Sequence, residues 1–229
     1  EMLRSLVGSE MCIRDSTGMA DCIIAGGTES MSLVPTAGWK TVPAYSIAVE
    51  EPDYYLSMGL TAEAVANEYK VSREDQDAFA LASHQKAKAA IENGHFKKGI
   101  LPIEVTETYV NEKNKRATRS FFVDTDDGVR ADTTIEALAK LKPAFAMKGS
   151  VTAGNSSQTS DGASFVIVMS EKMINALGLK PIGRLVNCAS AGVHPRIMGI
   201  GPVAAVPKVL KQAGMSLDQI DLFELNEAF

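Results

Sequence analysis

The sequence has few of the residues from which disulfide frameworks and zinc sites are built. It contains three cysteines and three histidines in 229 residues. The cysteines, Cys12, Cys22 and Cys188, are odd in number and show no C-x-x-C spacing, which argues against both kinds of framework and indicates a reducing compartment. Cys22 and Cys188 fall in apolar stretches that are typical of strands, so we expect both thiols to be buried and inert.

Long hydrophobic runs and a strong charge of one sign are also lacking. No apolar run approaches the ~20 residues that span a bilayer, and no N-terminal segment has the pattern of a secretory signal. The net charge is −5 with acidic and basic residues interspersed, which argues against nucleic acid as a partner but leaves room for a local basic pocket. With 45% hydrophobic residues, the composition predicts a soluble intracellular protein with a packed core.

Apolar periodicity and capping residues predict alternating strands and helices. The clearest helix begins at Ser72, where Asp75 completes a cap-like pair, and it ends before Gly94. Asn111 to Arg119 is polar and basic and predicts a turn. We expect further helices over Met58–Tyr69, Thr133–Leu141, Glu171–Leu177 and Val203–Ala213, and strands over Cys22–Ala25 (closed by Gly26 and Gly27), Leu101–Tyr109, Ser164–Met169, Arg184–Ala189 and Ile220–Leu225. This alternation favours a layered α/β architecture.

A loop of small residues, Val151 to Gln158, precedes the strand at Ser164. Such a loop can be a simple turn, because Gly and Asn tolerate positive φ. Small side chains also allow a ligand to approach the backbone closely, and Ser157 offers a hydroxyl. Both interpretations, a simple turn and a binding loop, are open from these residues alone.

The end of the sequence carries a second candidate feature. Met198-Gly199-Ile200-Gly201-Pro202 opens a predicted helix, and the apolar run after it ends at Asn226-Glu227. Chemistry in α/β proteins gathers where strands end, so the Asn226 amide is a candidate for polarising a carbonyl.

Together these segments resemble the thiolases. The chain has M-G-x-T-A-E from Met58, V-T-A-G-N-S-S from Val151, M-G-x-G-P from Met198 and N-E-A-F from Asn226. The resemblance runs from about Thr17 to Phe229 and covers only the middle of a family member.

The resemblance implies an αβαβα sandwich with an inserted lid. Residues 17–170 would form the rest of the N-terminal half, with a lid or loop domain at about 32–150, and residues 180–229 would begin the C-terminal half. Residues 1–16 fit poorly, and we interpret them as a non-native tail.

The resemblance also implies an activity and the residues that carry it. The reaction would be thiolysis of 3-ketoacyl-CoA, with coenzyme A as co-substrate and neither a permanently bound cofactor nor a metal. Ser57, where biosynthetic thiolases have His, favours a degradative enzyme. A homodimer or homotetramer in a bacterial-like cytoplasm is implied, with an organelle matrix as the alternative compartment. Asn226 would be catalytic, and the residues that contact acyl-CoA or CoA would be Met58, Arg130, Phe145, Ala153, Ser157, Met198, Ala228 and Phe229.

Three further catalytic parts of the family are not matched. The family's nucleophilic cysteine would fall at about residue 1, which is Glu1, and the second catalytic cysteine has no counterpart. Gly192-Val193-His194-Pro195 imitates the Gly-His-Pro box but precedes N-E-A-F rather than following it. We therefore expect the 229 residues alone to be inactive.

Two other function classes remain open at this point. One is a non-catalytic, thiolase-like protein that binds acyl-CoA or lipid. The other is a serine hydrolase that uses Ser190, because Cys188 to Gly192 resembles a G-x-S-x-G elbow without its first glycine.

Overall fold

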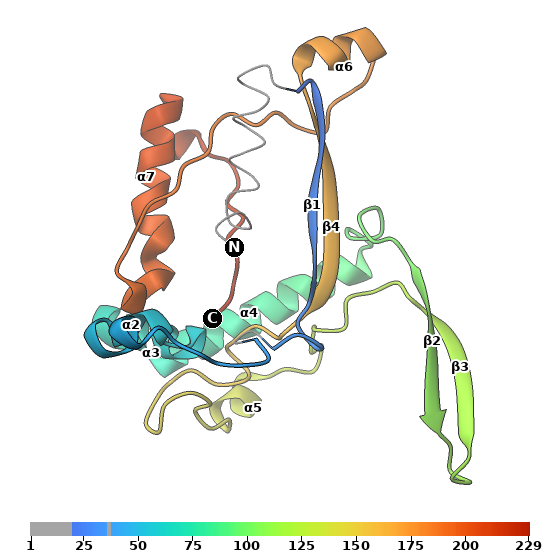
Figure 1. Ribbon diagram of the computed structural model, residues 1–229, viewed down its shortest axis with the longest axis vertical. Helices are drawn as coiled ribbons and strands as arrows, with labels where there is room; N and C mark the ends of the chain where they lie inside the picture. The colour runs from blue at the N-terminus through green and yellow to red at the C-terminus, as the bar shows by residue number, and fades with distance from the viewer. Residues whose placement is uncertain (1–19, 36–37) are drawn as a thin grey trace. The chain divides into compact units, whose positions relative to one another are not determined.

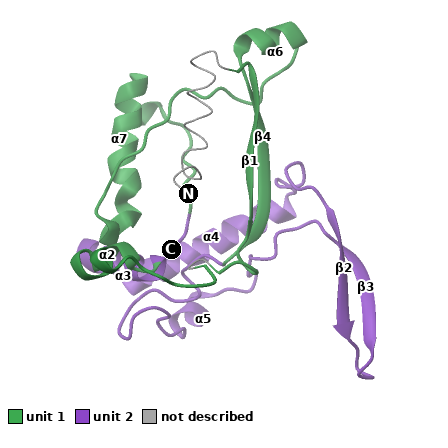
Figure 2. Cartoon of the chain, viewed as in Figure 1, with its two compact units in different colours: residues 1–57, 159–226 green, residues 58–158, 227–229 purple. Residues whose placement is uncertain are grey.

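The computed structural model describes residues 20–35 and 38–229, and the chain divides into two compact units (Figures 1 and 2). Unit 1 comprises Glu1–Ser57 and Thr159–Asn226. Unit 2 comprises Met58–Gln158 and Glu227–Phe229. The last three residues therefore belong to the same unit as the small-residue loop.

Unit 1 is built around an antiparallel ribbon of two strands (Figure 1). Strand β1, Cys22–Ser30, pairs with β4, Asp161–Met169, along its whole length. The prediction that β1 ends at Gly26-Gly27 is wrong. A Cβ atom at Gly26 would overlap the Phe165 ring and the Ser164 carbonyl, so glycine here permits the close approach of β4 instead of ending the strand.

The end of this ribbon carries an acidic group held by hydrogen bonds. The Ser32 amide donates to Asp161 Oδ1 at 2.9 Å, and the Ser32 hydroxyl donates to Oδ2. The Ser32 hydroxyl, together with the backbone amides of Ser32 and Met31, lowers the pKa of the Asp161 carboxyl below its ordinary value of 3.8. In a similar way, the Ser216 side chain and the Asp218 amide lower the pKa of Asp218.

We expect Ser32→Ala to raise the pKa of Asp161 toward its ordinary value, because one of the hydrogen bonds to the ionised form is removed. Since the folded pKa is depressed, the stabilisation from Asp161 is complete above the unfolded pKa and is lost as pH falls through the folded pKa. Carbon-13 NMR titration of the carboxyl groups measures this change, with Asp218 as the internal control. An unchanged Asp161 titration in the variant would contradict the assignment to Ser32.

Helix α6, Glu171–Leu177, follows β4 directly and confirms its predicted bounds. The Ser170 hydroxyl accepts from the Met173 amide at 3.3 Å, and Gly178 ends the helix with φ of 64°. The Ser170 amide also donates to the Asp21 carbonyl at 2.9 Å, which fixes the start of α6 beside the start of β1.

The remaining elements of unit 1 are helical. Helix α7, Gly201–Ala213, confirms the predicted helix and ends at Gly214 with φ of 67°. It is preceded by the 3₁₀ helix η2, Pro195–Ile200, in which Arg196 forms an ion pair with Asp53 at 3.5 Å. The other helices described in this unit are α2, Tyr45–Glu50, η1, Pro52–Tyr55, and η3, Leu217–Gln219.

The predicted strands over Arg184–Ala189 and Ile220–Leu225 do not form, and the prediction that Cys22 and Cys188 are buried is wrong. Residues 184–189 and 221–225 have no regular secondary structure, although Ile220 itself has extended dihedrals. A strand requires a hydrogen-bonded neighbour, and β1 and β4 are the only strands that the described part of unit 1 pairs. Cys188 is exposed because its segment packs in no sheet, and Cys22 is exposed because it begins a ribbon that buries only Ala25.

Unit 2 contains two long helices, a short helix and a hairpin. Helices α3, Met58–Tyr69, and α4, Arg73–Glu92, confirm the predicted helices. The Ser72 hydroxyl caps α4 by accepting from the Asp75 amide at 3.1 Å. Helix α5 is shorter than predicted and spans Ile135–Ala139.

The hairpin of unit 2 consists of β2, Ile103–Val110, and β3, Arg116–Val123. The predicted turn over Asn111–Arg119 is too long, because β3 begins at Arg116. Asn111 closes the turn by accepting from the amides of Lys113 and Lys115 at 3.0 Å. Arg119 pairs across the strands with Glu107 at 2.7 Å, so one of the basic side chains of β3 lies opposite an acidic one.

The buried residues of unit 2 are mainly polar. Leu138 and Val151 are its buried hydrophobic residues among those described, and they lie beside five buried polar residues: Thr61, Glu63, Asp77, Thr152 and Asn155. Every buried side-chain nitrogen and oxygen of the described residues has a hydrogen-bond partner.

None of the helices in the described ranges is both long enough and apolar enough to cross a membrane.

Candidate functional site

The Glu63 carboxylate on α3 forms hydrogen bonds with the start of the small-residue loop of unit 2. Glu63 accepts from the Ser150 amide at 3.0 Å and from the Val151 amide at 2.9 Å. Gln76 on α4 adds a bond from its side-chain nitrogen to the Ser150 hydroxyl at 2.8 Å. The start of the loop is therefore held by two helices.

A second carboxylate holds the far side of the loop. Asp77 on α4 forms an ion pair with Arg73 at 2.7 Å and accepts from the Asn155 side-chain nitrogen at 2.9 Å. Arg73 also donates to the carbonyls of Leu138 and Leu141, at 2.7 and 3.1 Å. This network joins α4, α5 and the loop.

Hydrogen bonds within the loop fix its backbone. Asn155 Oδ1 accepts from the Thr152 amide at 2.7 Å, and the Ser156 hydroxyl donates to the Thr152 carbonyl at 2.6 Å. Thr152 is 0% exposed, whereas Ala153 and Ser157 are exposed. The loop thus presents two of the predicted contact residues from a rigid, buried frame.

The terminal tripeptide docks on this loop. The Ser157 amide donates to the Ala228 carbonyl at 2.9 Å. The rings of Phe145 and Phe229 meet edge to face, with 5.9 Å between their centroids. Four predicted contact residues, Phe145, Ser157, Ala228 and Phe229, are therefore brought together within unit 2.

The residue beside Ala228 is anchored as well. Glu227 accepts from the Ser83 hydroxyl on α4. The tripeptide Glu227–Phe229 therefore has one contact for each of its residues, and Asn226 is the residue that immediately precedes it.

Met58 and Arg130 also belong to unit 2. Met58 is exposed at the start of α3, and the next residue, Gly59, lies so close to Phe145 that a Cβ atom there would overlap the ring. The Arg130 amide donates to His84 Nδ1 at 3.3 Å, and the Arg130 side chain is exposed.

The remaining predicted site residues belong to unit 1. Met198 is exposed in η2, and Asn226 is exposed at the end of this unit. Ser190, the alternative nucleophile, lies in the irregular segment 183–194, with no strand directly before it and no helix directly after it. The hydrolase elbow requires a strand, a sharp turn and a helix, and the structure does not give Ser190 this context.

Glu63, Asp77 and Asn155 shape the loop but are not among the site residues predicted from the sequence. A signal was present: Arg73 and Asp77 are four residues apart, the spacing of an ion pair on one helix face. Charged pairs at this spacing usually lie on solvated helix faces, so the pattern alone does not predict burial.

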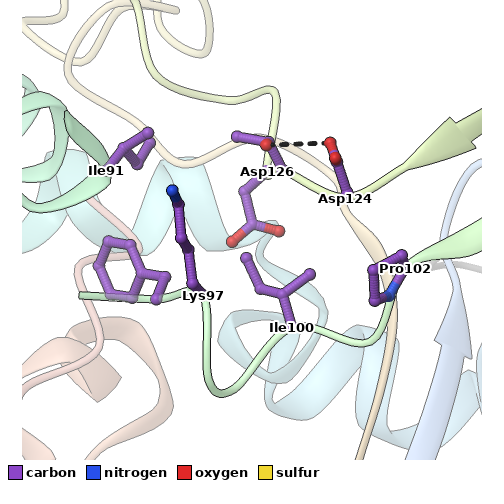
Figure 3. Close-up of a pocket in the computed structure, with 8 residues that line it drawn as sticks. Ile91, Lys97, Ile100, Pro102, Asp124 and Asp126 are labelled. Atoms are coloured by element: carbon purple, nitrogen blue, oxygen red, sulfur yellow. Dashed lines mark hydrogen bonds between the residues drawn. The ribbon is translucent and has the colours of Figure 1, made fainter. Parts of the chain in front are cut away.

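A cavity of about 230 Å³ lies elsewhere in unit 2 (Figure 3). Its lining combines apolar side chains with one lysine and two aspartates, and it shares none of the predicted site residues. It is lined by Ile91, Phe96, Lys97, Ile100, Pro102, Asp124, Thr125 and Asp126.

Comparison with known proteins identifies the class. The family model for the thiolase N-terminal domain matches residues 12–172, and the model for the thiolase C-terminal domain matches residues 179–229. The chain belongs to the thiolase family, and its thiolase-like α/β fold is confirmed.

Individual relatives support the same family. The chain is 53% identical to a 3-ketoacyl-CoA thiolase of Bacillus subtilis over 212 residues, which cover 93% of this chain and 54% of the relative. It is 48% identical to an acetyl-CoA acetyltransferase of Pseudomonas aeruginosa, with 93% and 55% covered. The chain thus spans about half the length of the curated relatives it matches.

Solved structures agree with these relatives. The dimeric peroxisomal thiolase of Saccharomyces cerevisiae superimposes with a TM-score of 0.83 at 35% identity, covering 97% of this chain and 55% of the yeast chain. Human mitochondrial 3-ketoacyl-CoA thiolase gives a TM-score of 0.81 at 37% identity, covering 97% and 57%.

Proposed function

We propose that the protein to which these residues belong catalyses thiolysis, in which a 3-ketoacyl-CoA and CoA give acetyl-CoA and a shortened acyl-CoA. The observation that carries this proposal is the docking of Glu227–Phe229 on the loop around Ser157, beside Phe145. Small exposed residues on a fixed backbone fit the approach of an extended thioester arm. The relatives named 3-ketoacyl-CoA thiolase support the same choice of reaction.

The proposed reaction has two steps. A thiolate attacks the 3-keto carbon, the bond between C2 and C3 breaks, and the acetyl-CoA enolate takes up a proton. The thiol of CoA then attacks the acyl group and releases the shortened acyl-CoA and the original thiol. Asn226 would stabilise the charge on the enolate oxygen through a bound water.

The proposed binding residues are assigned to different parts of the substrate. Ala153, Ser157, Ala228 and Met58 would contact the acyl and pantetheine parts of the substrate. Arg130 and Phe145 would contact the nucleotide, because a guanidinium suits phosphate and stacking partners. Met198 and Phe229 would each make a further contact with acyl-CoA or CoA.

Organisation, assembly and location are proposed with the activity. The two halves would comprise residues 17–170, with the lid at about 32–150, and residues 180–229. The active protein would be a homodimer or homotetramer in a bacterial cytoplasm, with CoA as co-substrate and neither a resident cofactor nor a metal.

A hybrid enzyme tests the proposed function. In it, residues 20–229 replace the matching segment of the Bacillus subtilis relative, whose remaining segments complete the chain. We expect CoA-dependent cleavage of acetoacetyl-CoA or a longer 3-ketoacyl-CoA. The cleavage is measured as the decrease in absorbance of the enolate form of the substrate. A folded hybrid without CoA-dependent cleavage would contradict the proposal.

A further inference from the structure

We infer that Glu63 and Asp77 are positioning residues that hold residues 150–155 in the conformation needed to bind the pantetheine arm of CoA. This inference rests on the proposed function, because it assigns these carboxylates to the binding of that substrate. Neither residue is among the predicted contacts of the ligand, and both bond to the loop itself.

Glu63 acts on the start of the loop. Its side chain is 5% exposed, and its carboxylate accepts from the amides of Ser150 and Val151 as well as from the Ser150 hydroxyl. No cation among the described residues forms an ion pair with it, so N–H and O–H donors meet its charge. Such charge-assisted bonds are about twice as strong as neutral ones.

A neighbouring glycine supports this assignment. A Cβ atom at Gly149 would overlap the Glu63 carboxylate, so the approach of the carboxylate to the Ser150 and Val151 amides depends on glycine at this position. The sequence before the loop is thus fitted to the carboxylate of α3.

Asp77 acts on the other side of the loop. It is 2% exposed and uses one oxygen for Arg73 and the other for Asn155. Asn155 passes this constraint on, because its own oxygen accepts from the Thr152 amide. Asp77 therefore fixes the residue just before Ala153.

The cost of burying charge favours a positioning role for Glu63 and Asp77 over simple packing. Burying a carboxylate is unfavourable, and an apolar residue of similar size commonly stabilises a core as well or better. An apolar residue, however, would leave the amides of Ser150 and Val151 without acceptors. Two buried helix carboxylates that both bond to one short loop are explained by a requirement for a defined backbone conformation at Ala153.

Kinetics of the hybrid test the inference through Glu63→Gln, which keeps size but replaces one acceptor oxygen with a donor. We expect the KM for CoA to rise about tenfold, while kcat changes less than about twofold. Asp77→Asn should shift KM in the same direction. Glu68→Gln, an exposed position on α3, is the matched control and should leave both parameters unchanged.

Hydrogen exchange of the 229-residue chain provides a readout that does not depend on activity. The Ser150 and Val151 amides should be protected in the unsubstituted chain and exchange at least tenfold faster in Glu63→Gln. Fast exchange in the unsubstituted chain, or equal exchange in both, would overturn the inference.

The two proposals fail in different ways. An unsubstituted hybrid that folds without cleaving substrate would contradict the proposed function alone, and hydrogen exchange would still decide whether Glu63 holds the loop. An active hybrid in which both variants keep the original KM, or lose kcat instead, would overturn the positioning role.

Discussion

Asn226→Ala is expected to lower kcat of the hybrid about 10²-fold, the size of effect seen when one donor to an oxyanion is removed. The amide would act only when negative charge develops on the enolate oxygen, so its loss should appear in kcat and leave the KM for CoA within about threefold. Steady-state thiolysis at saturating and limiting CoA separates the two parameters.

The matched control for this variant is Asn175→Ala, at an exposed position on α6 of the same unit. It removes the same amide from the protein surface and should leave turnover unchanged. Full turnover by Asn226→Ala would remove Asn226 from the mechanism, and an equal loss in both variants would indicate general damage to the hybrid.

The variants at Asn226 and Glu63 are expected to have opposite kinetic signatures. A group that stabilises the transition state changes kcat, whereas a group that shapes a binding loop changes KM. Within unit 2, the Ser157 amide bonds to the Ala228 carbonyl, so the loop that Glu63 holds contacts the tripeptide Glu227–Phe229.

The bounds of α4 and α6 and the end of α7 were predictable because local chemistry defines them. Ser72 and Ser170 cap α4 and α6 with their hydroxyls, and Gly178 and Gly214 end α6 and α7 in the left-handed region. Each of these signals lies within four residues of the boundary that it specifies. Helix ends are therefore the most local part of this fold.

Strands were less predictable because pairing depends on distant residues. Residues 184–189 have strand-like composition but no partner within the described part of unit 1. Arg116–Val123, in contrast, begins with polar and basic residues yet forms a strand against Ile103–Val110. Composition indicates how well a segment suits extended backbone, whereas hydrogen bonding to a neighbouring strand decides whether a strand forms.

The candidate site also has a part that was predictable from the sequence and a part that was not. The exposed positions, Ala153 and Ser157, belong to a contiguous motif that the sequence displays directly. Glu63 and Asp77 lie some 75 to 90 positions earlier on helices, where acidic residues usually face solvent. Their burial is visible only once the loop is packed against both helices.

Gly59→Ala is expected to destabilise unit 2 by roughly 1–3 kcal/mol, because overpacking forces neighbouring groups to move. Gly59 is buried in α3, and a Cβ atom there would overlap the Phe145 ring. Phe145 contacts Phe229, so the displacement should reach the predicted CoA site. Urea unfolding of the hybrid measures the loss, and the KM for CoA should rise with it.

The origin of this loss can be tested by removing the ring. In a Phe145→Ala background the added methyl group has space, so Gly59→Ala should cost less than half as much, which a double-mutant cycle measures. Gly201→Ala is the control, because among the described residues nothing outside the neighbouring backbone of α7 lies within 4 Å of its Cβ position. An equal cost with and without the Phe145 ring would show that the backbone at Gly59, and not its contact with Phe145, requires glycine.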